Sequence, residues 1–349
     1  MKFGFGTSTE KNGAPRIDRI APSAAIPGGE IALIGSGFSS RGAMKPVVRF
    51  GEAEGGLSLV SANRVVAQVP GDSVDGFVSI ESGGHRSEPV HVSIGKQIAD
   101  NLQPVANPAV DFEGNTYVTF SGPRGQRVPV SLYKVLGGTQ IKPFVTSLVN
   151  PSGLAFNKAG DLFVSCRNDG TIHRVMSDGR SEEWMEGMGI ATGIAFDRDG
   201  NLYVGDRSGT IFKINASREI FVFATLEPSL AAYHLAFHPD GDLYVTGPTT
   251  SSFDRVFRIT RNGEVTTFYR GLGRPQGLAF DVDANLYVAA SYGGRRGIVR
   301  ISPQGHAELV LSGSQIVGMA LQPTGRAMIA TVNAIYSLDW GVRGLPLLG

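Results

Sequence analysis

The sequence of 349 residues predicts an all-β protein: a six-bladed β-propeller preceded by a small β-sandwich. Three observations support this fold class. One phrase recurs six times, short apolar runs alternate with Gly and Asp or Asn turns, and the first part of the chain has a different strand pattern. We expect a flexible N-terminus over residues 1–14, the sandwich over 15–95 and the propeller over 96–349.

The repeated phrase consists of a small-apolar run, a turn with an acidic residue or glycine, and an aromatic-aliphatic run. Two copies are GIAFDRDGNLYV from Gly193 and GLAFDVDANLYV from Gly277. The residue after the turn recurs at Asn115, Asp161, Asn201, Asp242, Asn285 and Arg326. The intervals of 46, 40, 41, 43 and 41 residues suit a four-stranded propeller blade and are too long for a leucine-rich or ankyrin repeat.

Each repeat predicts four strands, because its apolar runs are short and none has helical spacing. In the third repeat we expect them at residues 193–196, 201–205, 210–214 and 220–224. The first strand carries alanine at one position in all six copies: Ala109, Ala155, Ala195, Ala236, Ala279 and Ala320. An innermost strand near the axis has little room, so we interpret this alanine as a packing requirement.

The ends of the repeat region predict how the ring closes. Residues 96–102 are similar in sequence to 142–148, which form the outer strand of the first repeat, whereas the last repeat has only three clear strands, ending at 335–340. We therefore expect residues 96–102 to pair with 335–340 and complete the last blade, which removes an exposed sheet edge. The tail from Gly344 is a competing candidate for that place.

The segment before residue 96 has five apolar runs, which begin at Ile31, Val47, Val65, Gly76 and Val90. Short strands at this spacing are typical of a sandwich. Gly28-Gly29, the Gly-Ser-Gly-Phe that ends at Phe38, and Phe50-Gly51 stand in the order of the IPT/TIG immunoglobulin-like family. The segment resembles that family over its whole length.

The propeller repeats resemble the NHL family, since GIAFDRDGNLYVGDRSGTIFKI from Gly193 is close to its consensus in strands and turn. More loosely, residues 96–340 resemble the senescence-marker and gluconolactonase family of six-bladed propellers. The second resemblance implies a lactone hydrolase that binds a divalent cation. Because one fold hosts many unrelated functions, the resemblance predicts the fold more strongly than the activity.

Composition narrows the possible partners. A net charge of +1 with interspersed signs argues against a nucleic-acid surface, and no apolar run approaches the roughly 20 residues of a membrane helix. Cys166 is alone, which permits no internal disulfide, and we interpret it as a buried thiol. We expect a monomer that binds a small molecule, a protein or a carbohydrate on a propeller face. Residues 1–14 lack a signal-peptide core, which favours the cytoplasm unless the N-terminus has been trimmed.

Chemistry in a propeller is expected where loops converge at one end of the axis. The loops that lead into the first strands and those that leave the second strands lie at the same end, which we name the pocket face. The positions just before the first strands are Ala106, Ser152, Thr192, Tyr233, Gln276 and Val317. We predict that a ligand binds among Ser152, Arg167, Asn168, Thr192, Asp206, Tyr233, His234, Gln276 and Tyr292.

Two features distinguish this predicted site. Tyr233 and His234 replace the glycine-containing start of most other blades, so their rings would either stack on a ligand or plug the channel, and plugging is the favoured interpretation. Arginines on the same face, Arg167, Arg207, Arg295 and Arg296, predict a pocket that tolerates anions, because guanidinium groups bind carboxylates and phosphates in a bidentate manner. Solvated surface arginines are the default interpretation of this pattern.

A metal site is not predicted. In the gluconolactonase family a Glu, an Asn and an Asp at these positions bind the cation, but this chain has neither a carboxylate nor an Asn at any of the six. Only Asp169 and Asp206 could begin such a site. Asn168-Asp169 resembles that family's substrate-contacting pair, although a tight turn is the favoured interpretation. We expect no cofactor, with a cation such as Ca²⁺ only if the hydrolase alternative holds.

The sequence thus predicts a binding or interaction protein, with a polar pocket and no assigned catalytic residue. A metal-dependent lactone hydrolase and a structural component of a surface or envelope are the alternatives. DRDGN at Asp197 and DVDAN at Asp281 are interpreted as hairpin turns, because no Glu closes a calcium loop.

Overall fold

The computed structural model describes residues 14–38, 45–73 and 76–346, and every regular element in these ranges is a β-strand. The chain divides into two compact units, Met1–Ile94 and Gly95–Gly349. Apart from Ala14, the N-terminal segment expected to be flexible lies outside the described residues. Across the described ranges there is no helix long and apolar enough to cross a membrane.

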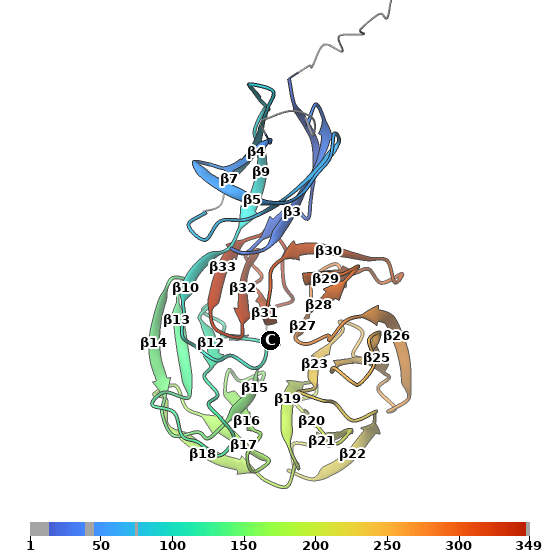
Figure 1. The fold of residues 1–349 in the computed structure, drawn as a ribbon. Helices are drawn as coiled ribbons and strands as arrows, with labels where there is room; N and C mark the ends of the chain where they lie inside the picture. The colour runs from blue at the N-terminus through green and yellow to red at the C-terminus, as the bar shows by residue number, and fades with distance from the viewer. Residues whose placement is uncertain (1–13, 39–44, 74–75, 347–349) are drawn as a thin grey trace, which may run out of the picture. The chain divides into compact units, whose positions relative to one another are not determined.

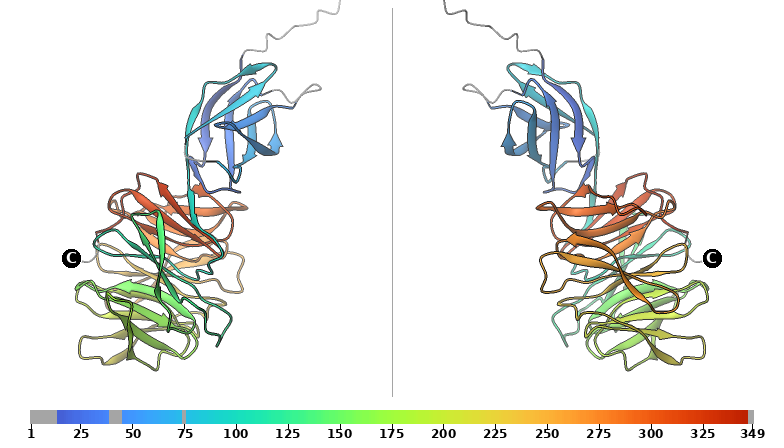
Figure 2. Two further views of the ribbon diagram at one scale, coloured as in Figure 1. Left: turned by 90° about the vertical axis from the view of Figure 1, so that its left-hand side faces the viewer. Right: turned by 90° about the vertical axis from the view of Figure 1, so that its right-hand side faces the viewer.

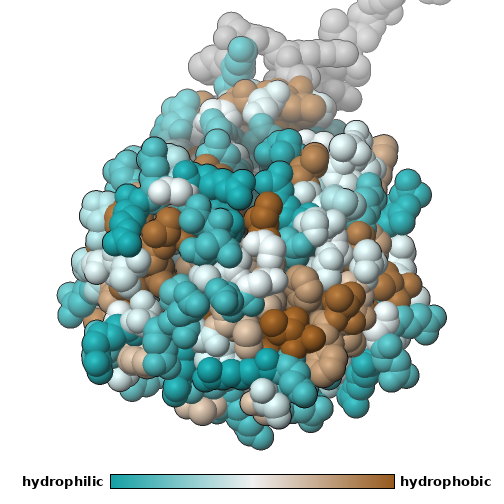
Figure 3. Space-filling model, turned by 90° about the horizontal axis from the view of Figure 1, so that it is seen from below, coloured by the Kyte–Doolittle hydropathy of each residue, from teal (hydrophilic) through white to brown (hydrophobic). Residues whose placement is uncertain are grey.

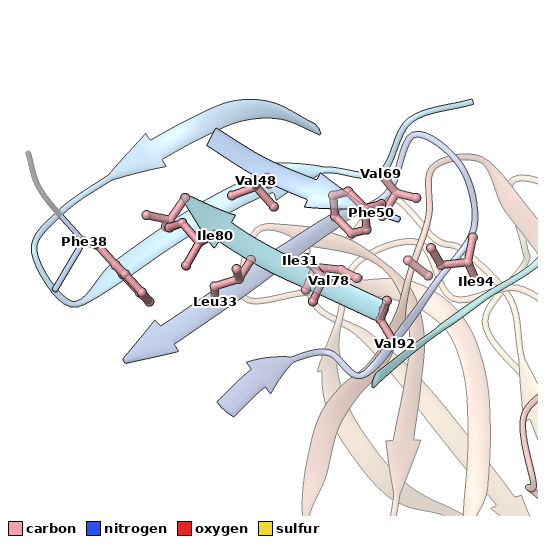
Figure 4. Close-up of a cluster of buried hydrophobic side chains, with 13 residues drawn as sticks. Ile31, Leu33, Phe38, Val48, Phe50, Val69, Val78, Ile80, Val92 and Ile94 are labelled. Atoms are coloured by element: carbon pink, nitrogen blue, oxygen red, sulfur yellow. The ribbon is translucent and has the colours of Figure 1, made fainter. Parts of the chain in front are cut away.

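The first unit packs two sheets face to face. One sheet pairs β1 (Arg16–Ala21), β3 (Glu30–Ser36), β6 (Arg64–Gln68) and β5 (Ala53–Val60), and the other pairs β4 (Val47–Phe50), β7 (Gly76–Ser82), β9 (Val90–Ile94) and β2 (Ala24–Ala25). The short β8 (His85–Arg86) lies beside β7. Figure 4 shows Leu33, Val48 and Ile80 among the apolar side chains gathered between the sheets.

Five of these strands confirm the apolar runs identified in the sequence, but β5 was missed. Its Gly55-Gly56 pair weakens the strand signal, because glycine is disfavoured in strands. The structure explains one of the two glycines. A Cβ on Gly55 would lie 2.7 Å from Cε2 of Phe50 and 2.9 Å from the carbonyl oxygen of Gln68, so no larger residue fits.

The second unit is a β-propeller, in which sheets surround a central axis (Figure 1). Its described residues form five separate four-stranded sheets.

The first sheet contains β11 (Ala109–Val110), β12 (Thr116–Thr119), β13 (Leu132–Leu136) and β14 (Gln140–Val145), and the second contains β15 (Pro151–Phe156), β16 (Leu162–Cys166), β17 (Thr171–Val175) and β18 (Ser181–Met185). The third contains β19 (Ala191–Phe196), β20 (Leu202–Asp206), β21 (Thr210–Ile214) and β22 (Ile220–Thr225), and the fourth contains β23 (His234–Phe237), β24 (Leu243–Thr246), β25 (Asp254–Ile259) and β26 (Val265–Leu272). The fifth contains β31 (Ile316–Leu321), β32 (Arg326–Thr331), β33 (Ile335–Asp339) and, as its outer strand, β10 (Lys96–Ala99). The strands β27 (Leu278–Phe280), β28 (Leu286–Tyr292), β29 (Arg295–Ile301) and β30 (Ala307–Ser312) pair antiparallel in chain order. Figure 2 shows the blades edge-on.

The predicted closure is confirmed. β10 pairs antiparallel with β33, with Lys96 opposite Ser337, so an N-terminal strand completes the last sheet of the propeller. The competing segment pairs elsewhere, since Gly344 forms an isolated bridge with Asp281. The four strands expected in the third repeat are also confirmed, as β19 to β22.

The glycine of the repeated phrase is required because neighbouring first strands approach closely near the axis. A Cβ on Gly153 would lie 2.4 Å from the carbonyl oxygen of Thr192, and a Cβ on Gly193 would lie 2.4 Å from that of Tyr233. The repeated alanine Ala195 packs against a cluster formed by its own blade and the following one. Both observations agree with a crowded inner strand.

The Asp-containing turns form the opposite end of the blades, which we name the hairpin face. Asp197 accepts hydrogen bonds from the backbone N–H of Asn201 at 2.8 Å and from its Nδ2 at 2.7 Å, and Asp281 holds Asn285 in the same way. The carboxylates are therefore occupied as turn-forming groups, as expected from the sequence. Around the outside, polar and apolar side chains alternate in patches, as Figure 3 shows for one side.

Candidate functional site

The strand register places the predicted site residues at one end of the blades. Pro151 at the start of β15 lies opposite Cys166 at the end of β16, and Ala191 lies opposite Asp206 in the next blade. Loops that lead into the first strands therefore lie beside turns that leave the second strands. This arrangement confirms that these loops share the pocket face.

A hollow of about 380 Å³ opens among these loops. Its wall includes four of the residues predicted from the sequence: Ser152, Arg167, Thr192 and Gln276. The wall also includes Arg207, Ile190, Leu230, Val317 and Val332. The hollow thus combines hydroxyl, amide and guanidinium groups with an apolar surface.

Arg167 is the most unusual group in this wall. It is half-buried, its Nε is buried without a hydrogen-bond partner, and its Nη2 donates only to the carbonyl oxygen of Gly122, at 3.4 Å. No ion pair neutralises it within the described residues. Burial, together with repulsion from Arg207 and Arg124, lowers the pKa of the Arg167 guanidinium below its usual value. A bound anion would relieve both effects.

The remaining polar residues of the wall are held in place by hydrogen bonds between neighbouring blades. Thr192 Oγ1 donates to the carbonyl oxygen of Gly205 at 2.8 Å and accepts the backbone N–H of Tyr233 at 3.1 Å. The hydroxyl of Thr246 donates to the carbonyl oxygen of Gln276. Because these bonds join successive blades, the wall of the hollow is preformed.

The structure corrects the expected position of Tyr233 and His234. Their exposed fractions are 1% and 3%, and neither side chain lines the hollow. A Cβ on Gly205 would lie 2.8 Å from the Cβ of Tyr233, and a Cβ on Gly247 would lie 2.8 Å from Cδ1 of its ring. Its hydroxyl donates to the carbonyl oxygen of Glu227. Tyr233 is therefore a wedge within the protein interior, and burial lowers the pKa of His234 to about 4.

The other predicted residues are also outside the wall of the hollow. Asp206 accepts the backbone N–H of Ile190 at 2.8 Å and the hydroxyl of Ser208, so its carboxylate is occupied in organising the turn. Asn168 lies in the turn between β16 and β17, and Tyr292 ends β28. In that first turn, Asp169 accepts the N–H and the hydroxyl of Thr171, which supports the interpretation of the Asn168-Asp169 pair as a turn.

The residues of this face do not fit a divalent cation. The wall of the hollow contains no carboxylate, and the described part of the chain holds no group of three or more His, Cys, Asp or Glu side chains placed to bind a metal. Asp169 and Asp206, the two acids that could have begun such a site, are bound to their own turns. Hard cations require several oxygen ligands together, and this set is missing here.

Sequence reasoning missed the apolar part of the wall. Val332 occupies the turn after β32 and corresponds to Arg167 and Arg207 in their blades, so the repeat alignment contained a signal that was overlooked. Leu230 lies in a loop outside the repeated phrase and had no such signal. Both side chains are well exposed, at 44% for Val332 and 50% for Leu230.

Comparison with known protein families finds one match in each part of the chain. Residues 15–96 match the IPT/TIG domain family, and residues 193–214 match a family described as strictosidine synthase-like, N-terminal. No curated protein was found that matches the chain.

Several solved structures are similar. A protein of unknown function from Bacteroides thetaiotaomicron has a TM-score of 0.58 at 14% identity, and an auxiliary nutrient binding protein from that organism has 0.55 at 13%. In both comparisons the match covers 94% of this chain and 98% of the other. A gluconolactonase of Xanthomonas campestris has 0.59 at 15%, covering 71% of this chain and 89% of the other. At these identities the solved structures show the fold alone, and the IPT/TIG domain is shown by the family match over residues 15–96.

Proposed function

We propose that this protein is a ligand-binding propeller whose hollow on the pocket face binds an organic anion with an apolar body. In this proposal β27 to β30 form a sixth blade, since their order repeats that of the other five. The observation that carries the proposal is Arg167, a half-buried guanidinium with an unpartnered Nε and no acidic neighbour in the wall. Such a group is well suited to bind a carboxylate.

The apolar part of the wall specifies the rest of the ligand. Leu230 and Val332 are exposed, and Ile190 and Val317 complete the surface between them and the arginines. No aromatic ring lines the hollow on which a sugar ring could stack. A hydrocarbon body with an acidic end matches this wall, because pockets bind through apolar contact and orient their ligands with a few polar groups.

A lactone hydrolase is the second candidate, and its support is the similarity of the fold to a gluconolactonase. The residues that line the hollow argue against a metal-dependent hydrolase. No carboxylate lines the hollow, and Asp169 and Asp206 are bound to their own turns, so no group is placed to hold the cation or act as a base and we derive no reaction step. The nutrient-binding structure of similar fold is compatible with a binding role for the present chain.

Calorimetric titration with decanoate and with decanol tests this function. We expect decanoate to bind and the uncharged alcohol to bind at least about tenfold more weakly, because a charge-assisted hydrogen bond contributes about 1.5–3 kcal/mol. Arg167→Gln should weaken decanoate by a similar factor. The matched control is Arg180→Gln, which removes an exposed arginine paired with Asp178 on the hairpin face. Equal binding of acid and alcohol, or an unchanged Arg167 variant, would contradict the proposal.

A further inference from the structure

We infer that the ligand carries two acidic groups, because a second, arginine-lined hollow adjoins the first. This inference rests on the proposed function and extends it. The second hollow has a volume of about 180 Å³ and is lined by Arg274, Arg296, Ser291 and Gln315, among others. Its wall comes from the loop after β26, the end of β28, the start of β29 and the loop before β31, at the same pocket face.

The two hollows share part of their wall. Gln276 and Val332 line both of them, so one apolar and one amide side chain stand between the two pairs of arginines. Arg167 and Arg207 lie on one side of this shared wall, and Arg274 and Arg296 lie on the other. A single extended molecule can therefore contact both arginine pairs across an apolar centre.

The second arginine pair also lacks acidic partners. Neither Arg274 nor Arg296 forms an ion pair with any residue that the structure describes. The nearby acid, Asp254, is 1% exposed and accepts the backbone N–H and hydroxyl of Thr249, at 3.0 and 2.7 Å. Its other oxygen accepts the backbone N–H of Arg274 at 3.2 Å. This carboxylate thus holds the backbone of Arg274 in place and does not line the hollow.

The backbone at this hollow is held in an unusual conformation. Arg274 has a φ of 49° and Gln315 has a φ of 59°, a region that residues other than glycine adopt at a cost. Asp254 holds the first of these, and a hydrogen bond from Val332 N to Gln315 O at 3.0 Å holds the second. These two hydrogen bonds fix the backbone that carries the side chains of Arg274 and Gln315 at the hollow.

The ligand class that satisfies both hollows is a linear α,ω-dicarboxylate. One carboxylate would bind Arg167 and Arg207, the hydrocarbon chain would cross Val332, and the second carboxylate would bind Arg274 and Arg296. A monocarboxylate such as decanoate would leave the second pair unpartnered. A dicarboxylate of matching length gains a second charge-assisted contact without a second loss of translational and rotational entropy.

Calorimetry with α,ω-dicarboxylates from adipate to dodecanedioate, compared with decanoate, tests this inference. We expect one chain length to bind at least about tenfold more tightly than decanoate. Arg274→Gln and Arg296→Gln, tested separately, should remove most of that gain. The control is Arg300→Gln, because Arg300 lies on the same strand as Arg296 and pairs with Glu308 at the hairpin face. It should leave both ligands unchanged.

Each result has a distinct meaning. If decanoate binds through Arg167 but no dicarboxylate binds more tightly, the second subsite is wrong and the proposed function stands. If a dicarboxylate does bind more tightly but both variants keep the gain, the assignment to Arg274 and Arg296 is wrong. If no carboxylate binds at all, the proposed function and this inference fail together.

Discussion

The arginines on the two faces of the propeller differ in their partners. On the hairpin face Arg174 pairs with Asp161 at 2.9 Å, and Arg326 pairs with Asp339 at 3.0 Å. Arg258 in another blade pairs with Asp242 in the same way. These pairs join neighbouring strands within one blade. They neutralise charge on a surface whose turns are already closed by Asp side chains.

The pocket face has arginines of similar number without such partners. Arg124, Arg167, Arg207, Arg274 and Arg296 form no ion pair within the described residues. Acidic residues are present on this face, but Asp169, Asp206 and Asp254 are bound to backbone N–H and hydroxyl groups. The hairpin face thus holds several of its arginines in ion pairs, although Arg198, Arg218 and Arg261 in its described turns form none, whereas the five arginines named for the pocket face are all without an acidic partner. The difference suggests which face has a binding role.

The largest expected effect is on stability, from substituting the buried Tyr233. Tyr233→Ala should lower the free energy of unfolding by about 3–5 kcal/mol, because it leaves a cavity between Gly205 and Gly247 and removes the hydroxyl that binds Glu227. Urea denaturation measures this loss. Tyr233→Phe keeps the ring and should cost less than half as much. If Tyr233→Ala instead leaves stability unchanged and weakens decanoate binding, the ring contacts the ligand as first predicted.

The sequence predicted those parts of the site that follow the repeat. Ser152, Thr192 and Gln276 each stand just before the glycine of the repeated phrase, so the period alone brought them to one face. The position of Tyr233 was not predictable in this way. Its side chain occupies space left by Gly205 on β20 and by Gly247, which follows β24, and this is a non-local packing relation that no local pattern records.

A similar limit applies to the second hollow. Arg274 lies two residues before Gln276, outside the repeated phrase, and its significance comes from the hydrogen bond to Asp254, which lies on β25. The strand β5 of the first unit was missed for a related reason, since Gly55 is required by contact with Phe50 and weakens the local strand signal. Repeat periodicity therefore predicts on which face of the propeller a residue lies. Contacts between strands and loops decide whether that residue lines a hollow or packs in the interior.

A smaller effect is expected from pH at the buried start of β23. The pKa of His234 falls from 6.5 to about 4 on folding because of burial. Between these values the unfolded chain binds the proton and the folded protein does not, so stability is lost as the pH falls. From pH 7 to pH 5 this loss should be about 2 kcal/mol.

Urea midpoints of the wild type and of His234→Gln at the two pH values measure the contribution of this histidine. The variant should lose about 2 kcal/mol less than the wild type on acidification. Exposed His306→Gln is the matched control and should follow the wild type. An identical acid response in His234→Gln would show that the histidine does not stay neutral in the folded protein.

The smallest effect tests the comparison of the two faces directly. Arg174→Gln removes one partner of an exposed ion pair and should lower the free energy of unfolding by up to about 1 kcal/mol, because pairs of this exposure contribute 0–1 kcal/mol. Arg167→Gln should leave stability unchanged or raise it slightly, since it removes a poorly solvated charge that Arg207 and Arg124 repel. Decanoate binding should respond in the opposite order, weakened in Arg167→Gln and retained in Arg174→Gln. Urea denaturation and calorimetry on the same two proteins give both results. If Arg167→Gln is the less stable protein and binds decanoate normally, the pocket-face arginines serve the fold, and the contrast between the faces has no functional meaning.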